Sequence, residues 1–273
     1  GPNDPGPGDP QVSDPLEDGT KDHPFDTIQE GINLAVDGYT VLVRQGSYFE
    51  PAGGSTIDFL GKNITLKSEN STDWDIIDNT VIRSYVQFSG TEDPNCKFAG
   101  FKIRNLEGAI YGNHTHATIS HCNITGNGPC GATVIQDCDG TISNCLITDN
   151  TTFFFCGVYP VVFECNGLIK NCTIANNESG LSVGTATIEN CIIHNNTGPQ
   201  LVVTNGNTMN ISYSNVQYGL EGVVGDGHVN WGPGNIDTDP CFVRLGYWIT
   251  DEITLIEGDY HLRSEGWRWN TED

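Results

Sequence analysis

Basic residues are scarce in this sequence. The chain of 273 residues has 12 Lys and Arg against 35 Asp and Glu, which gives a formal net charge of −23 at pH 7. A surface of this sign repels the phosphates of nucleic acid, so we expect no nucleic-acid partner. Divalent cations, a saline medium or a cationic partner fit the charge better. The shortage of Lys and Arg also leaves few places where an anionic substrate could be held.

Long apolar runs and closely spaced cysteine pairs are also missing. No hydrophobic stretch approaches the about 20 residues that cross a bilayer, so we expect no membrane span. None of the ten cysteines forms a Cys-x-x-Cys pair, which argues against a zinc site. The chain has no signal peptide and starts at Gly rather than Met, so we interpret it as a processed or excised piece. Ten cysteines in so acidic a chain favour an extracellular or cell-surface location.

What the sequence does contain is a repeated phrase. It reads Ile-Ser-His-Cys-Asn-Ile at 119–124, Ile-Ser-Asn-Cys-Leu-Ile at 142–147, Ile-Lys-Asn-Cys-Thr-Ile at 169–174 and Ile-Glu-Asn-Cys-Ile-Ile at 188–193. A small polar pair follows each copy, and a weaker copy lies at 98–103. The cysteines, at 122, 145, 172 and 191, are 23, 27 and 19 residues apart. A repeat of this period is typical of a solenoid.

The residue types in the phrase predict short strands joined by tight corners. Ile, Val and Thr between Asn and Gly favour β-strands. Ile119 and Cys122 can both point inward only if the chain turns at the residue before the cysteine. That residue is His121, Asn144, Asn171 or Asn190, and Gly100 in the weaker copy. Asn and Gly tolerate a left-handed backbone, and a column of Asn can hydrogen-bond from coil to coil.

Stretches outside the repeat complete a family pattern. They are the run of residues 25–43, the short segments 46–48 and 61–66, and the segments 234–243 and 258–262. Together with the repeats, the sequence resembles the right-handed parallel β-helix repeat proteins of the pectate-lyase-like superfamily, of the secreted bacterial type. The resemblance implies an all-β fold, a right-handed parallel β-helix of about eight coils. It does not imply one activity, because this scaffold carries lyases, hydrolases, adhesins and structural proteins.

Composition divides the chain into three parts. Residues 1–19 are rich in Gly, Pro and Asp and predict a tail or linker. Residues 20–216 form the predicted β-helix, with a capping helix near residues 25–36 across its N-terminal end. Residues 217–273 contain four of the five tryptophans and predict an aromatic-rich cap over the last coil. The alternative for these tryptophans is a platform on which sugars stack.

A polysaccharide lyase of this fold would need a basic side chain as its base. Lys102 and Arg104 alternate on the outer face of one predicted strand, and His114 and His116 follow soon after. These four residues are the best lyase site in the sequence. The alternative is that they are ordinary outward residues in solvent. The motifs of a polygalacturonase-type hydrolase are absent.

Other residues predict metal binding or covalent bonds. Asp237 and Asp239 offer oxygen ligands for Ca²⁺, the one cofactor that the sequence suggests. The alternative is that this stretch is a turn in which Asp bonds its own backbone. Disulfide candidates are Cys130 with Cys156 and Cys138 with Cys165, which stack between neighbouring coils. The four repeat cysteines point inward and behave either as small buried hydrophobes or as a bonded ladder.

Glycosylation sequons in predicted loops start at Asn70, Asn113, Asn150 and Asn177.

Two kinds of function remain open. The first is a non-catalytic extracellular module of a cell-surface or matrix assembly, with residues 1–19 binding another copy in a filament or sheath. The second is a polysaccharide lyase, or another carbohydrate-binding protein, acting on an acidic polysaccharide. The missing catalytic motifs and the few basic residues favour the first.

Overall fold

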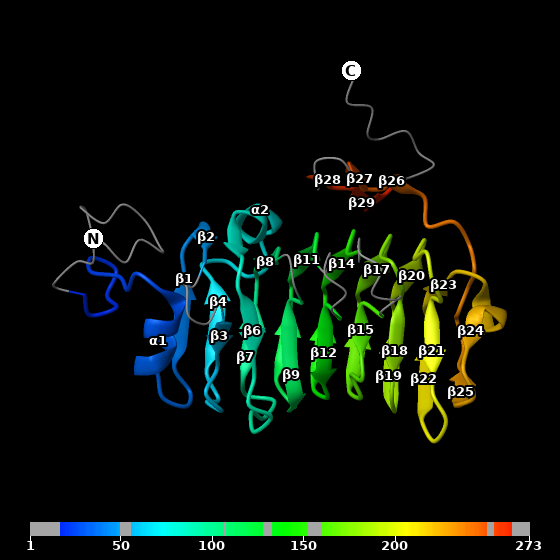
Figure 1. Cartoon of the computed structure of the whole chain (residues 1–273), viewed down its shortest axis with the longest axis horizontal. Coiled ribbons are helices and arrows are strands. Elements are labelled where there is room, and N and C mark those ends of the chain that lie inside the picture. The colour runs from blue at the N-terminus through cyan, green and yellow to red at the C-terminus, as the bar shows by residue number, and fades with distance from the viewer. Residues whose placement is uncertain are drawn as a thin grey trace, which may run out of the picture.

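The computed structural model describes residues 17–49, 56–105, 108–127, 133–151, 160–249 and 254–263. Within these ranges the chain winds into a long solenoid, with its axis horizontal in Figure 1 and its N-terminal helix at one end. Successive strands pass from sheet A to sheet B to sheet C and back to A, and every pairing within these three sheets is parallel. The expected parallel β-coil is therefore confirmed.

The three sheets contain nine, eight and eight strands among the described residues. Sheet A is β1 (Thr40–Val43), β4 (Thr65–Ser68), β7 (Lys97–Ala99), β10 (Thr118–Ser120), β13 (Thr141–Ser143), β16 (Leu168–Lys170), β19 (Ala186–Glu189), β22 (Thr208–Ser212) and β25 (His228–Trp231). Sheet B is β2 (Gly46–Tyr48), β5 (Thr80–Ile82), β8 (Lys102–Ile103), β11 (Asn123–Thr125), β14 (Leu146–Thr148), β17 (Thr173–Ala175), β20 (Ile192–His194) and β23 (Asn215–Val216). Sheet C is β3 (Thr56–Asp58), β6 (Tyr85–Gln87), β9 (Ile110–Thr115), β12 (Ile135–Cys138), β15 (Val162–Phe163), β18 (Leu181–Val183), β21 (Leu201–Val203) and β24 (Val223–Val224).

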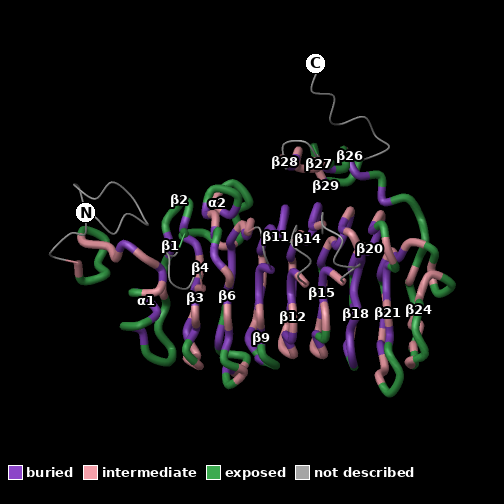
Figure 2. The backbone as a smooth tube through the Cα atoms, in the orientation of Figure 1, coloured by how far each residue is buried: buried purple, intermediate pink, exposed green. Residues whose placement is uncertain are grey.

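The repeated phrases lie directly above one another. In sheet A, Ile119 pairs with Ile142, and the same row continues through Ile169 and Ile188. In sheet B the second Ile of each phrase forms a matching row. The cysteine between them is buried in every copy, at Cys122, Cys145, Cys172 and Cys191. These rows form the continuous core inside the coil, which Figure 2 shows in purple.

The corners before the cysteines are left-handed, as predicted. His121, Asn144, Asn171 and Asn190 have φ between 53° and 55°. The amide of Asn190 donates to the side-chain oxygen of Asn171 at 2.8 Å, and that of Asn171 donates to Asn144 at 3.1 Å. An exposed column of Asn side chains therefore links neighbouring coils at this corner.

A second column of Asn is buried at the next corner, between sheets B and C. It runs through Asn127, Asn150, Asn177 and Asn196 to Gln200. Each Asn amide also donates to a backbone carbonyl of the preceding coil, as Asn150 does to Ile124 O at 3.0 Å. Because a buried amide without partners is costly, the column holds the coils in one register.

The N-terminal end has the expected helical cap. Helix α1 (Ile28–Leu34) packs against β1 and β3. Thr27 and Glu30 form a capping box at its start, in which the Thr27 side chain accepts from the Glu30 backbone. A second short helix, α2 (Trp74–Asp78), precedes β5, and a 3₁₀ turn, η1 (Gly219–Gly222), precedes β24. Neither α1 nor α2 has the length and apolar character needed to cross a bilayer, and no other described helix does.

The C-terminal part differs from the prediction in two ways. The parallel sheets continue past residue 216 through β24 and β25, and Trp231 packs against the end of the core. The remaining strands, β26 (Phe242–Arg244), β27 (Tyr247–Ile249), β28 (Thr254–Ile256) and β29 (Asp259–Leu262), pair as two small antiparallel sheets. Figure 1 shows these strands beside β11, β14 and β17 rather than over the last coil. We call residues 242–249 and 254–263 the C-terminal strap.

Candidate functional site

The C-terminal strap covers part of the outer face of sheet B. The rings of Phe242 and Tyr260 pack edge to face, with centroids 5.1 Å apart. They form a small buried cluster with Ala175 of β17. Leu146 and Ile192, which point outward from β14 and β20, pack against this cluster. The strap therefore removes from water a row of apolar side chains that sheet B would otherwise expose.

One strap carboxylate binds two basic side chains of the coil. Glu257 accepts from Lys102 Nζ at 2.6 Å and from Arg104 Nη1 at 3.2 Å. The two cations lie two residues apart on and just after β8, so they point to the same side of sheet B. The Lys102 side chain is 13 % exposed, and those of Arg104 and Glu257 about a third. Lys102 and Arg104 therefore form a carboxylate-binding site, and Glu257 of the same chain occupies it.

A second polar contact forms at Asp149, at the corner after β14. Its carboxylate accepts from the Tyr260 hydroxyl, from Asn176 Nδ2 at 2.7 Å and from Gly258 N at 3.2 Å. Its backbone carbonyl accepts from Trp248 Nε1 at 3.1 Å. Three of these four donors belong to the strap, so Asp149 is its main polar anchor.

Burial changes the proton affinity of this anchor. Burial raises the pKa of Asp149 above its usual value, and the hydrogen bonds from Tyr260 and Asn176 offset only part of that rise. Burial, together with the nearby Asp149 charge, also raises the pKa of Tyr260. The Tyr260 hydroxyl therefore keeps its proton and remains the donor across the physiological range.

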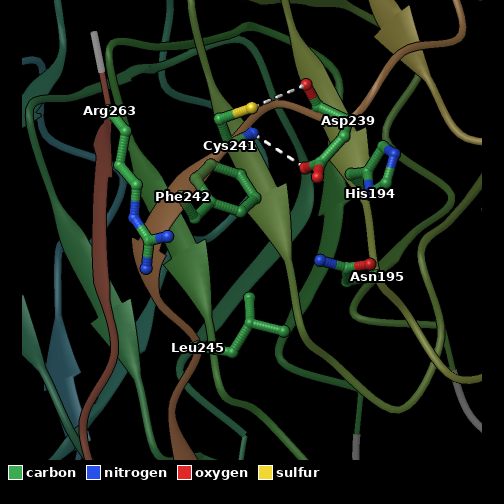
Figure 3. Close-up of a pocket in the computed structure, with 7 residues that line it drawn as sticks. All are labelled: His194, Asn195, Asp239, Cys241, Phe242, Leu245 and Arg263. Carbon is green, nitrogen blue, oxygen red and sulfur yellow. Dashed lines mark hydrogen bonds between the residues drawn. The ribbon is translucent and has the colours of Figure 1, made fainter. Parts of the chain in front are cut away.

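A pocket of about 580 Å³ lies where the chain leaves the last coil to become the strap. Figure 3 shows the residues that line it: His194, Asn195, Asp239, Cys241, Phe242, Leu245 and Arg263. Cys241 donates its backbone N–H to Asp239 Oδ1 at 2.8 Å and its thiol to Asp239 O at 3.6 Å. Arg263 donates its backbone N–H to Cys241 O at 2.8 Å. The guanidinium of Arg263 and the amide of Asn195 are donors suited to a small hydroxylated or anionic ligand.

Comparison with known proteins places the chain in a family. A model of the right-handed β-helix region matches residues 69–230, which is more than half of the chain. This chain belongs to the right-handed β-helix family. No curated protein matches it, and no solved structure does. Membership of this family establishes the fold of the β-helix protein. It does not establish an activity, which depends on the residues of the site.

The four residues of the predicted lyase site are not brought together. Lys102 and Arg104 lie at sheet B, under the strap, whereas His114 belongs to β9 of sheet C and pairs with Asp139 at 3.1 Å. His116 precedes β10 of sheet A and is exposed. The chain turns two corners of the coil between Arg104 and His116, so closeness in sequence does not give closeness in space.

The predicted Ca²⁺ ligands do not form a cluster with other metal-binding groups. Among the described residues, no three His, Cys, Asp or Glu side chains are placed to hold a metal ion. Asp239 accepts from the backbone of Cys241 at 2.8 Å, which is the turn that the sequence offered as the alternative. Asp237 is exposed.

Two of the four glycosylation candidates are buried rather than placed in exposed loops. Asn150 and Asn177 are each 2 % exposed or less because they belong to the buried Asn column. A glycan at either residue would break that column and has no room. Asn70 and Asn113 are exposed, and both remain candidates.

The structure contains the described cysteines as free thiols. Cys138 and Cys165 lie on neighbouring coils as expected, and Cys138 donates its backbone N–H to Cys165 Sγ at 3.3 Å, but the two are not bonded to each other. The four repeat cysteines are free as well, so they behave as small buried hydrophobes. Cys130 and Cys156, the other predicted pair, lie outside the described residues.

Sequence reasoning missed the residues that matter most here. Glu257, Asp149 and Tyr260 come from segments far apart in the chain, and no motif connects them. The one available signal was the pair of basic residues at 102 and 104 in a chain with so few cations. Two neighbouring cations attract a carboxylate, and Glu257 of the strap supplies it.

Proposed function

We propose that this β-helix protein is a non-catalytic extracellular module, a rigid rod within a cell-surface or matrix assembly. The observation that carries the proposal is the pairing of Lys102 and Arg104 with Glu257. A lyase base must be free to take a proton from its substrate. Here the two best-placed cations are bound by a carboxylate of the same chain, and the two histidines lie on other parts of the coil.

The construction of the coil supports a mechanical role. Two columns of Asn connect successive coils, one exposed and one buried, and a row of Ile lies on each side of the cysteines. Because each coil contacts only its neighbours, such repeated bonds make the rod uniform along its length. A uniform, polar rod is suited to present a surface to partners rather than to enclose a substrate.

The buried thiols suit an oxidising medium. Burial raises the pKa of Cys122 well above that of a free thiol, and raises that of Cys96 to about 12. Since the thiolate is the reactive form, these side chains resist oxidants and thiol reagents. An extracellular location is therefore compatible with free thiols at Cys96 and Cys122 in the core.

Self-association through residues 1–19 remains part of the proposal. Residues 1–16 lie outside the described residues, so the proposal rests on their composition, rich in Gly, Pro and Asp. Sedimentation of the full chain and of a chain starting at residue 20 tests it. The full chain should form larger species at a concentration where the shorter chain stays monomeric, and equal behaviour of the two would remove this part.

The alternative function is a lyase acting on an acidic polysaccharide. It is tested by incubating the protein with pectate and with alginate and measuring the ultraviolet absorbance of unsaturated chain ends. The non-catalytic proposal expects no increase above a buffer control. A steady increase that depends on enzyme concentration would establish the lyase instead.

A further inference from the structure

Cys241 is the one exposed thiol among the described cysteines, and it lines the pocket at the start of the strap. The other seven described cysteines are buried. The pocket has a volume of about 580 Å³, which is a usual size for a small-molecule site. A small reagent can therefore reach Cys241, whereas the thiols of the core are shielded.

A second group in the same pocket lacks a partner. His194 of β20 is 7 % exposed, and its Nδ1 atom is buried with no hydrogen-bond partner among the described residues. Buried polar atoms of this kind are costly, and most are paired in folded proteins. Because the His194 ring lines the pocket, a ligand there can supply the missing hydrogen bond.

The pocket contains one positive and one negative side chain. Arg263 donates to Val243 O, which leaves other N–H groups of its guanidinium for a ligand carboxylate. Asp239 accepts from Cys241 N through Oδ1, and its carboxylate has further acceptor sites for an ammonium group. In Figure 3 the Arg263 side chain lies on one side of Cys241 and Asp239 on the other. The thiol therefore lies between partners for both charges of an amino acid.

The remaining walls of the pocket suit the same kind of ligand. Phe242 and Leu245 provide apolar surface against which a methylene group can pack. The Asn195 side chain, which is half-buried, can donate to a carboxylate or accept from an ammonium group.

We propose that Cys241 is a thiol-exchange site for small disulfides of the amino-acid type, such as cystine. The Cys241 thiolate attacks one sulfur of the disulfide, so that a bond forms between Sγ and this sulfur and the original sulfur–sulfur bond breaks. The other half leaves as a thiolate and takes up the proton that Cys241 gave up. One disulfide is consumed and one is formed, so the step needs no other oxidant. The product is a mixed disulfide with its carboxylate on Arg263 and its ammonium group on Asp239.

The exchange requires no movement of the strap. Cys241 is exposed while Tyr260 and Trp248 hold the strap on the coil. The inference goes beyond the proposed function, because a rigid rod does not need a reactive thiol. It holds whether or not the chain self-associates or acts on a polysaccharide.

The test compares the rates at which Cys241 of the full chain reacts with cystine and with hydroxyethyl disulfide, which has no charges. Mass spectrometry of peptides measures the mixed disulfide at Cys241 after short incubations at low ionic strength. The same two rates in concentrated urea, where the pocket is lost, correct for the different reactivities of the reagents. The ratio of the cystine rate to the hydroxyethyl disulfide rate should be about fivefold higher in the native chain than in urea, the equivalent of two exposed ion pairs. Equal ratios would overturn the inference, and this comparison needs no variant.

Variants then assign the preference to particular side chains. Arg263→Gln should slow the reaction with cystine about threefold and should not slow the reaction with cystamine, which has no carboxylate. Arg83→Gln removes the same charge from an exposed position after β5 and should react as the wild type does. His194→Phe, which removes the ring nitrogens, should also reduce the preference for cystine. Equal slowing of both reagents by Arg263→Gln would contradict a carboxylate contact.

A second copy of the chain is the competing partner for an exposed thiol. Non-reducing electrophoresis of the concentrated protein, incubated with an excess of cystine, distinguishes the two. The inference predicts a monomeric chain with one cysteine attached at Cys241, and a reductant should release it. A dimer bonded through Cys241 under these conditions would refute the inference, because it would show that the thiol meets another chain first.

Discussion

The hydroxyl of Tyr260 donates to the carboxylate of Asp149 across 111 residues of sequence. This bond fixes the strap to sheet B at a corner of the coil. Asp149 is buried there, and its carboxylate has two further partners, Gly258 of the strap and Asn176 of the next coil. The strap is therefore held by a specific polar contact as well as by apolar packing.

Replacing Tyr260 by Phe should loosen the strap. The change removes one hydrogen bond and leaves the buried carboxylate of Asp149 with fewer donors, which costs about 1–3 kcal/mol. Because the coil itself is unaffected, we expect exchange of the strap amides to accelerate while the amides of β13 and β16 stay protected. Loss of protection in both regions alike would mean that the strap and the coil unfold as one unit.

The stability of the strap should depend on pH through Asp149. Burial raises the pKa of this carboxyl in the folded protein, whereas the unfolded chain has the ordinary value of 3.8. Between these two values the folded state binds more protons than the unfolded state, so this group makes the protein more stable as the pH falls through that window.

The comparison of the wild type with Asp149→Asn isolates this effect. The free energy of unfolding should change with pH differently in the two proteins, and the wild type should gain relative to the variant between neutral pH and about pH 4. Urea unfolding at several pH values measures it. Parallel pH profiles would show that Asp149 has the same pKa in the folded and unfolded states.

The buried Asn column should be essential for stability. Asn150→Ala removes the bonds to Asn127, Asn177 and Ile124 O, and leaves several buried groups unpaired. We expect a loss on the order of 3 kcal/mol or more in urea unfolding. The matched control is Asn171→Gly, which keeps the left-handed corner of the exposed column and should cost less than about 1 kcal/mol. Equal losses for the two variants would contradict the distinction between the columns.

Thiol reactivity tests the arrangement of the described cysteines. Eight cysteines among the described residues are free thiols. Cys241 is exposed, and the other seven are buried. Brief treatment of the native protein with iodoacetamide should therefore modify Cys241 and leave the seven intact, as read by mass spectrometry of peptides. Rapid modification of Cys145 or Cys172 would contradict their place in the core.

The coil could be predicted from the sequence because its signal is local and repeated. Each phrase, Ile-x-His-Cys-x-Ile in the first copy and Ile-x-Asn-Cys-x-Ile in the next three, contains a strand, a left-handed corner and a second strand, and the four copies support one another. The same argument explains why Asn171 was placed correctly. The polar pair at residues 149 and 150 resembles a loop in sequence, so the sequon at Asn150 suggests an exposed site. In the structure this pair forms the second corner of the coil, and the Asn150 side chain is buried.

The strap could not be predicted because no local, repeated pattern in the sequence indicates it. Its position depends on contacts between residues far apart in the chain, such as Glu257 with Lys102, and no repeat reports them. The tryptophans favoured a cap over the last coil, and Trp231 does pack there. Trp248 instead reaches Asp149 on the side of the coil, since β26 to β29 pair with one another and fold back. Trp267 and Trp269 lie outside the described residues.

The measurement that tests the account most directly is a lyase assay of Glu257→Gln on pectate and alginate. This variant frees Lys102 and Arg104, the two cations best placed to act as a base. The account assigns them to holding the strap through Glu257, so it predicts no unsaturated ends from the variant even at high protein concentration. Ultraviolet absorbance that increases with time, and disappears when Lys102 is also replaced by Gln, would contradict it.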